Sequence, residues 1–323
     1  LFFFYVWGVV LLLIVCMFFV IVRFPVLPFS NVLCWYKMFV LVKRIEVCTV
    51  PELPEVETVR RVLAPQLAGR KILGGDVCNV RVVAYPDVES VAQRLAGQVI
   101  NGMRRRGKFL VIMLSSGDDV VLHLRMTGSL LLVPLDYTLE KHTHLVISLD
   151  CGYRLCFTDP RRFGRFWLVQ SGAEDLVSGI HRLGLEPFDS FLTGDYLRSS
   201  FGKSRKAIKS CLLMQDVVAG IGNIYSDEIL FKAGISPLRA ACSLNDVEWR
   251  TLAAAIHERL AYYVGKNDIS PADYLSGGGR DYRNTPYLNV YGHAGKPCPL
   301  CGEPLYRAVV GGRSSVFCRN CQR

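Results

Sequence analysis

Four cysteines near the end of the chain have the spacing of a metal site. They form two Cys-x-x-Cys pairs, Cys298/Cys301 and Cys318/Cys321, with 16 residues between the pairs. Each pair can place two thiolates on one side of a tight turn, and two such turns supply the four tetrahedral ligands of a structural zinc ion. Two disulfides or four unrelated thiols are the alternatives, and the doubled spacing favours zinc over both. We therefore expect one Zn²⁺, closed and structural, with no part in catalysis.

The segment between the cysteine pairs reads as a β-hairpin. Two strand-like runs, residues 305–310 and 314–317, flank Gly311-Gly312. A glycine pair between two such runs is typical of a hairpin turn. This arrangement puts the metal at the base of the hairpin and Arg313 beside its tip.

Three basic stretches have the composition of phosphate-binding surfaces. They are Arg104-Arg105-Arg106-Gly107-Lys108, Pro160-Arg161-Arg162-Phe163-Gly164-Arg165, and a group comprising Lys203, Arg205, Lys206 and Lys209. Any one alone is typical of a solvated face, but three of them together with a basic hairpin favour phosphate binding. Phe163 follows two arginines, and an aromatic side chain in such a turn can wedge into a base stack. A buried aromatic at a strand end is the alternative.

A glycine-paired turn, Gly220-Ile221-Gly222-Asn223, leads into a predicted helix. Backbone N–H groups at a helix N-terminus can bind an anion, and the helix dipole favours this. The alternative is a tight interhelical turn in which only glycine fits.

The chain has 323 residues, of which 51% are hydrophobic, and a net charge of +10. This composition excludes wholesale disorder, and 12 cysteines in so long a chain exclude a disulfide-stapled miniprotein. A helix is predicted over residues 53–67, where Val56, Val59 and Leu63 follow a helical period and Gly69 marks the end. Short runs rich in branched or aromatic residues then predict strands, and later segments predict helices. The strands are expected at 109–114, 120–124, 130–133, 145–149, 154–158 and 166–169, and the helices at 207–213, 224–233, 247–264 and 271–275.

Several motifs, in order along residues 51–323, resemble those of the bacterial formamidopyrimidine-DNA glycosylases. The first of these motifs is Pro51-Glu52-Leu53-Pro54-Glu55. The sibling endonuclease VIII group typically has glycine at the third position, so Leu53 favours the oxidised-purine branch. The other matching motifs are Arg106-Gly107-Lys108-Phe109-Leu110, His123-Leu124-Arg125-Met126-Thr127-Gly128, Lys141-His142-Thr143-His144, Asp159-Pro160-Arg161-Arg162-Phe163-Gly164, Gly220-Ile221-Gly222-Asn223-Ile224-Tyr225 and the cysteine hairpin.

The resemblance implies a fold and a set of domains. The fold class is α+β: an N-terminal helix with a β-sandwich, a helix-two-turns-helix domain and a C-terminal zinc-finger hairpin. The expected boundaries are residues 51–183 for the catalytic domain, 184–280 for the helical DNA-binding domain and 281–323 for the zinc-finger hairpin. Residues 1–50 form an apolar extension outside the similarity.

The resemblance also implies a reaction. The secondary amine of an N-terminal proline, here Pro51, attacks the sugar C1′ and forms a Schiff-base-like iminium. Glu52 transfers protons to and from the sugar, and Lys108 assists. Glu55 is expected near the lesion, although a first-turn helix acid favoured by the dipole is the alternative for both acids. The expected activity is removal of 8-oxoguanine and formamidopyrimidines, followed by β,δ-elimination at the abasic site.

DNA contacts are likewise carried over from the resemblance. Lys108, His142, Asn223 and Arg313 match ligands of the phosphates that flank the lesion. Three other side chains match those that fill the space left by the everted nucleotide, namely Met126, Arg161 and Phe163. The segment 276–288 matches the loop that closes over the flipped base. Flipping is required because C1′ cannot be attacked inside an intact stack.

Residues 1–50 admit two interpretations. The first 22 residues carry no charge and are long enough to span a bilayer, which indicates a membrane anchor. However, a proline joined to Val50 has an amide nitrogen and no nucleophilicity. We expect instead that translation starts at Val50, read as methionine, and that removal of this methionine exposes Pro51.

Two further functions compete with the glycosylase and lyase. A membrane-tethered, non-catalytic DNA-binding protein would retain residues 1–50, and the N-terminal mass separates it from the enzyme. An endonuclease VIII-like glycosylase would prefer oxidised pyrimidines. The expected partner is double-stranded DNA containing oxidised purines, with no protein partner, and the expected form is a cytoplasmic monomer.

Overall fold

The computed structural model describes residues 51–173, 178–280, 282 and 284–323; the predicted extension, residues 1–50, lies outside the described residues. The first described element is helix α3, Leu53–Leu67, with the bounds expected from the sequence. Val56, Val59 and Leu63 are all buried, as their helical spacing predicts. After Ala68 the chain leaves the helix through Gly69, whose φ of +78° suits glycine.

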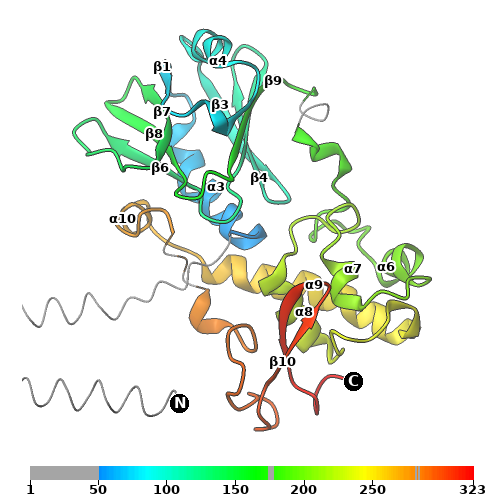
Figure 1. Ribbon diagram of the computed structural model, residues 1–323. Helices are drawn as coiled ribbons and strands as arrows, with labels where there is room; N and C mark the ends of the chain where they lie inside the picture. The colour runs from blue at the N-terminus through cyan, green and yellow to red at the C-terminus, as the bar shows by residue number, and fades with distance from the viewer. Residues whose placement is uncertain (1–50, 174–177, 281, 283) are drawn as a thin grey trace, which may run out of the picture. The chain divides into compact units, whose positions relative to one another are not determined.

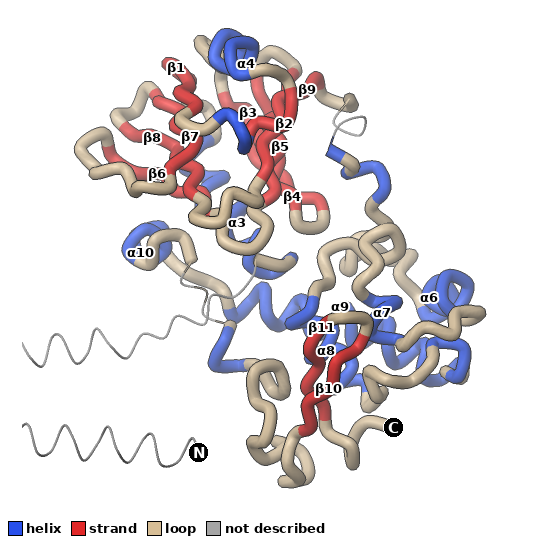
Figure 2. The backbone as a smooth tube through the Cα atoms, viewed as in Figure 1, coloured by secondary structure: helices blue, strands red, loops and turns tan. Residues whose placement is uncertain are grey.

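Two β-sheets form the first domain (Figure 2). The four-stranded sheet is antiparallel, in the order β1 (Ile72–Val77), β7 (Thr143–Leu149), β8 (Tyr153–Thr158) and β6 (Ser129–Pro134). The five-stranded sheet has the order β2 (Val83–Tyr85), β9 (Arg165–Gln170), β5 (Asp118–His123), β4 (Phe109–Leu114) and β3 (Ile100–Arg106), and only its β2–β9 pair is parallel. Side chains of both sheets share one hydrophobic core, which confirms the predicted sandwich.

Helix α3 joins the sandwich to the helical part of the protein. It packs against β3 and β4 of one sheet, against β6 of the other, and against α9 (Asp246–Lys266) (Figure 1). A short helix within the sandwich, α4 (Val88–Leu95), was not predicted; it packs on β1. Because α3 contacts both parts, its N-terminal residues lie where the two parts meet.

The helical part has its own core, built mainly around α8 and α9. The predicted helices are present with shifts of at most two residues at each end, and α6 is an addition. The bounds are α6 (Gly194–Phe201), α7 (Ile208–Leu212), α8 (Asn223–Ala233) and α10 (Pro271–Ser276). Helix α10 packs against α3 and β6, and the Tyr274 hydroxyl donates to the carbonyl of Leu130 at 3.0 Å.

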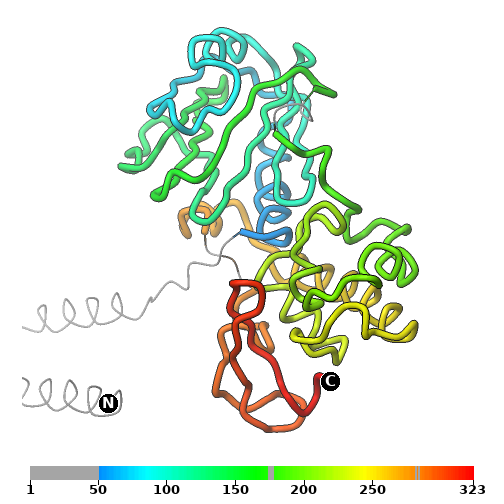
Figure 3. The backbone as a smooth tube through the Cα atoms, turned by 45° about the vertical axis from the view of Figure 1, so that its right-hand side comes forward, coloured from blue at the N-terminus to red at the C-terminus, as the bar shows by residue number. Residues whose placement is uncertain are grey.

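The C-terminal hairpin consists of β10 (Tyr306–Val310) and β11 (Arg313–Phe317), joined at Gly311-Gly312 as predicted. Both glycines have positive φ, +55° and +75°. In Figure 3 the hairpin (red) lies with the segment that leads into it (orange), and together they enclose a small core that includes Phe231 of α8. Among the described helices, none is both long and apolar enough to cross a membrane.

Candidate functional site

The buried Glu52 carboxylate lies at the N-terminus of α8, although α8 begins 171 residues further along the chain. One carboxylate oxygen accepts from the Ile224 N–H at 3.0 Å and the other from the Tyr225 N–H at 3.3 Å. These amides were predicted to be free to bind an anion. The anion they bind is the side chain of Glu52, and the helix dipole stabilises its charge.

Gly222 explains why a glycine must precede α8. A Cβ at this position would lie 2.3 Å from the Glu52 carboxylate and 2.6 Å from the Lys108 Nζ. Both side chains therefore pack against the backbone of Gly222, and their charged ends meet there. Burial lowers the pKa of Lys108, while the nearby charges of Glu52 and Glu55 act in the opposite direction. This arrangement brings a carboxylate and an amine, both predicted as catalytic, to one point.

Glu55 occupies a second, fully buried acid position on α3. Its carboxylate accepts from the Glu52 N–H at 2.8 Å and from the side chains of Tyr225 and Asn284. Burial raises the pKa of Glu55, and the charge of Glu52 adds to this effect. Asn284 belongs to the segment predicted to close over the lesion. Glu55 therefore connects that segment to α3 and, through Tyr225, to α8.

Pro51 is buried directly before Glu52. It stands at the end of α3 that faces the N-terminus of α8, since the Leu53 N–H donates to the Gly220 carbonyl at 3.2 Å. The predicted nucleophile, the predicted proton-transfer acid and Lys108 thus meet at one place. Asn223, the first residue of α8, is half-buried at the edge of the same place.

Three predicted space-filling side chains lie on two neighbouring loops. Met126 and Phe163 are large apolar residues that remain 39% and 51% exposed. The Arg161 guanidinium approaches the Met126 sulfur at 3.7 Å. The alternative that Phe163 is a buried aromatic is wrong, because half of its surface is open to solvent. These loops present apolar and cationic groups together, as a DNA-inserting surface requires.

The four cysteines converge as the sequence predicts. Their sulfur atoms all lie within 4.8 Å of one another, with Cys298 and Cys321 at 3.9 Å and Cys301 and Cys318 at 3.5 Å. Thiolates bound tetrahedrally at about 2.3 Å from zinc are about 3.8 Å apart, so the donor set fits this metal. The cluster holds the ends of the hairpin, and Arg313 is exposed at the start of β11.

Comparison with protein families agrees with this arrangement. The N-terminal domain of formamidopyrimidine-DNA glycosylase matches residues 50–166, its H2TH domain matches residues 183–271, and a zinc finger found in FPG and IleRS matches residues 295–323. The formamidopyrimidine-DNA glycosylase of Pelotomaculum thermopropionicum is 40% identical over 273 residues, which cover 84% of this chain and 99% of that protein. The Moorella thermoacetica protein of the same name is 45% identical over 257 residues, covering 80% and 94%. The chain belongs to the formamidopyrimidine-DNA glycosylase family.

Solved structures of this family have the same fold. A complex of Lactococcus lactis Fpg with FAPY-dG-containing DNA aligns with a TM-score of 0.77 and 34% identity, over 84% of this chain and 100% of that one. A complex of the same protein with abasic-site DNA gives a TM-score of 0.78 and 34% identity over the same shares. The α+β fold with its sandwich, H2TH and zinc-finger parts is thus confirmed, and one structural zinc suits the cysteine cluster.

Asp159 is a buried residue of this glycosylase fold to which sequence reasoning gave no role. Its carboxylate accepts from the Thr127 hydroxyl at 2.5 Å, from the Arg161 N–H at 3.2 Å and from the Gly164 N–H at 2.7 Å. Its own N–H donates to the carbonyl of His142 at 3.0 Å. Asp159 therefore joins the loops of Met126, Phe163 and the half-buried His142. Its position within a matching motif was the available signal, but an acid that precedes a basic run does not by itself suggest a shared acceptor.

His123 was also missed. Its Nδ1 accepts from the Arg125 N–H at 3.0 Å, which leaves the proton of the neutral ring on Nε2. Burial, with the charges of Arg125 and Lys108, holds the pKa of His123 well below its usual range. This ring therefore lies near Lys108 as a neutral hydrogen-bond donor. The signal was its place in the motif that contains Met126.

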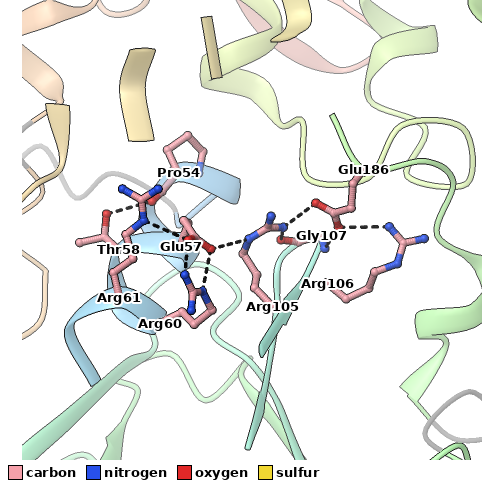
Figure 4. A network of polar contacts seen from close by, with 9 residues as sticks. All are labelled: Pro54, Glu57, Thr58, Arg60, Arg61, Arg105, Arg106, Gly107 and Glu186. Carbon is pink, nitrogen blue, oxygen red and sulfur yellow. Dashed lines mark hydrogen bonds and ion pairs between the residues drawn. The ribbon is translucent and has the colours of Figure 1, made fainter. Parts of the chain in front are cut away.

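The first basic stretch does not form a free phosphate-binding surface in this family member. Arg104, Arg105 and Arg106 lie within β3, and each meets a carboxylate: Asp119 for Arg104, Glu57 and Glu186 for Arg105, and Glu186 for Arg106. Figure 4 shows the contacts of Arg105 and Arg106. Only Lys108, beyond the strand, reaches the site.

Lys209, predicted with the third basic group, is fully buried. Its Nζ donates to the Asp227 carboxylate at 2.7 Å and to the Ser314 carbonyl at 2.9 Å. Asp227 also accepts from the Val316 N–H at 2.9 Å. This lysine fixes the hairpin to α7 and α8, directly beside Arg313, and is not a DNA contact.

Proposed function

We propose that the protein excises oxidised purines, such as 8-oxoguanine and formamidopyrimidines, from double-stranded DNA and then cleaves the abasic strand by β,δ-elimination. As a family member it is a base-excision-repair DNA glycosylase. The observation that carries the residue assignment is the Glu52 carboxylate held beside Pro51 and Lys108 by the N-terminus of α8.

Pro51 is the proposed nucleophile. The lone pair of its free amine forms a bond to C1′, while the glycosidic bond breaks and its electron pair leaves with the base. The attacking nitrogen then loses its proton, the sugar ring opens as O4′ gains one, and an iminium remains. An α-amine has a pKa near about 8, so a useful fraction is neutral at physiological pH. The iminium accepts electrons when a C2′ proton is removed, which expels first the 3′ and then the 5′ phosphate.

Glu52 is the proposed proton carrier between these atoms. Its carboxylate is adjacent to Pro51 and can take the nitrogen's proton and deliver one to O4′. The two α8 amides fix its orientation before the substrate arrives. Lys108, with its lowered pKa, is proposed to bind a flanking phosphate and assist proton transfer.

The remaining assignments concern DNA contacts. We assign flanking phosphates to His142, Asn223 and Arg313, and we place Glu55 near the lesion. The zinc held by the four cysteines supplies rigidity alone, and through it Arg313 keeps its position at the hairpin tip. We propose that the protein acts as a monomer in the bacterial cytoplasm, where its chromosomal substrate lies, with the domain boundaries expected above.

Substrate preference tests the function directly. Duplexes that differ only in the lesion, 8-oxoguanine or an oxidised pyrimidine, are incubated with protein whose N-terminus is Pro51, and base release and strand cleavage are followed. We expect faster release of 8-oxoguanine. Faster release of the pyrimidine would instead support the endonuclease VIII-like alternative, which deserves this test because Lactococcus lactis Fpg has been solved with DNA containing an oxidised pyrimidine. Release of neither base would contradict the glycosylase assignment.

Phe163→Ala is expected to impair flipping without changing the salt dependence of DNA binding. The substitution removes an apolar filler from the unstacked helix but no charge. A 2-aminopurine beside the lesion reports flipping by its fluorescence, and its transient should be slowed or lost. The slope of log K against log salt should not change, since counterion release depends on phosphate contacts. Phe191→Ala is the matched control, because this phenylalanine is 74% exposed outside the two loops. A normal transient in Phe163→Ala would refute the wedge.

A further inference from the structure

The turn that carries Lys108 is held by a residue from the other domain. Gly107 and Lys108 connect β3 to β4, and Gly107 has a φ of +55°. The Gly107 N–H donates to Glu186 Oε1 at 2.6 Å, and the Gly107 carbonyl accepts from Arg105 Nη1 at 2.9 Å. Both hydrogen-bonding groups of this residue are therefore engaged, one with Glu186 directly and one with an arginine that Glu186 also binds.

The Glu186 carboxylate is the centre of this arrangement (Figure 4). Besides Gly107, it accepts from Arg105 Nη1 at 2.8 Å and from Arg106 Nη1 at 3.1 Å. Arg106 also donates to the carbonyls of Leu183 and Gly184, at 2.8 and 2.6 Å, just before Glu186 in the chain. Three donors from the end of β3 and the adjoining turn thus converge on one carboxylate, and the segment bearing that carboxylate is itself fixed by Arg106.

Arg105 also connects this arrangement to helix α3, which begins next to Pro51 and Glu52. Its Nε donates to the Glu57 carboxylate of α3 at 3.1 Å, and its side chain is only 9% exposed. Burial acts to raise the pKa of Glu57, but the hydrogen bonds and charges of Arg60, Arg105 and Arg61 outweigh it and hold this pKa below its usual value. Glu57 therefore stays ionised on the helix that begins next to Pro51 and Glu52.

The turn also packs on the segment before α8. A Cβ on Gly107 would lie 3.1 Å from a methyl group of Leu183, 3.4 Å from the Ala219 Cβ and 3.6 Å from the Gly220 N. Gly220 is two residues from Gly222, against which the Lys108 Nζ lies. A shift of the turn would therefore move Lys108 relative to α8 and Glu52.

We propose that Glu186 is a positioning residue that holds the Gly107–Lys108 turn so that Lys108 reaches a flanking phosphate and the Glu52 carboxylate. This rests on the proposed function for the role of Lys108, but the contacts that carry it are independent of DNA. The arginines of β3 contribute by completing the carboxylate's environment and do not bind phosphate themselves.

Salt dependence distinguishes this role from ordinary stabilisation. Binding to a duplex with a non-cleavable abasic analogue is measured across salt concentrations, with all variants made in protein whose N-terminus is Pro51. Lys108→Ala removes one phosphate contact and should flatten the slope of log K against log salt by about 1. We expect Glu186→Ala to flatten it equally, although it removes an anion, and the double variant to show no further change.

A purely structural role for Glu186 predicts that the slope of log K against log salt is not flattened in Glu186→Ala. If Glu186 only balanced charge, its loss would release Arg105 and Arg106 toward DNA, and the slope would steepen or stay unchanged. Either result, or additive effects in the double variant, would overturn the proposal. Asp118→Ala is the control. Asp118 accepts two hydrogen bonds from Arg94 and is the first residue of β5, at the other end of that strand from His123, which lies near Lys108. It should leave the slope unchanged.

Amide hydrogen exchange at Gly107 tests the contact with Glu186 independently of the enzyme's activity. In DNA-free protein the Gly107 amide should lose protection in Glu186→Ala and keep part of it in Glu186→Gln, whose amide oxygen can still accept. Unchanged protection in Glu186→Ala would overturn the proposal even if 8-oxoguanine is excised normally. Failure of the unmutated protein to excise any lesion would instead count against the proposed function alone.

Discussion

Borohydride trapping on an 8-oxoguanine duplex is expected to yield a covalent adduct with protein that begins at Pro51, and none above background when Pro51 is joined to Val50. The reason is the nitrogen itself: in the joined chain it is a tertiary amide, whose lone pair is delocalised into the carbonyl and cannot attack C1′. The two proteins have the same sequence from Pro51 onward. Reduction of the iminium makes the adduct visible as a band of increased mass.

The control for this comparison is the mass of each preparation, which establishes its N-terminus before trapping. Comparable trapping by the joined chain, confirmed as unprocessed, would contradict the assignment of Pro51. Pro51→Gly in the processed protein refines the test. It should weaken lesion cleavage yet keep some abasic-site cleavage, because a primary amine can still form an imine.

Glu52→Gln is expected to lose base excision by about 10² to 10⁴-fold, the usual range for removing a general acid–base group. The amide cannot exchange the proton that the sugar requires. Its NH₂ group would also face the N–H of Ile224 or Tyr225, which now donates to a carboxylate oxygen at 3.0 or 3.3 Å. Imine formation with a pre-formed abasic site should suffer less, since the base has already left.

Two rates test this prediction: the rate of base excision from an 8-oxoguanine duplex and the rate of borohydride trapping on abasic DNA. Glu258→Gln is the matched control, because Glu258 is an exposed acid that pairs with Lys232 at 2.8 Å on the helical part. It should change neither rate. Equal loss of excision and trapping in Glu52→Gln would contradict the separate roles given to Pro51 and Glu52.

Local patterns predicted the elements that local physics determines. The bounds of α3 follow from its apolar spacing and from Gly69, and the zinc site follows from two short cysteine spacings that need no knowledge of the fold. Helix α4 was missed because it has only eight residues, too few for the helical spacing of Val88, Val91 and Leu95 to stand out among the neighbouring strands. Its start, where Asp87 accepts from the Ser90 N–H, was the available signal.

Partners distant in the chain explain what the sequence did not reveal. Arg105 pairs with Glu57, 48 residues before it, and with Glu186, 81 residues after it, so a run that reads as basic is locally neutralised. Lys209 likewise reads as part of a basic group, but its partner Asp227 lies 18 residues further along the chain, and the two are buried together. Glu52 alone reads as an ordinary first-turn acid, and only the fold brings the N-terminus of α8 to it. The family resemblance supplied what the isolated residues could not.

Mass spectrometry of the trapped complex tests the central claim most directly. The borohydride-reduced adduct on an 8-oxoguanine duplex is digested with nuclease and protease, and the peptide that carries the sugar remnant is sequenced. The account predicts a single modified residue, Pro51 at the free N-terminus, with the remnant on its nitrogen. A remnant on Lys108, or on any other lysine, would show that a different amine forms the iminium and would contradict the account.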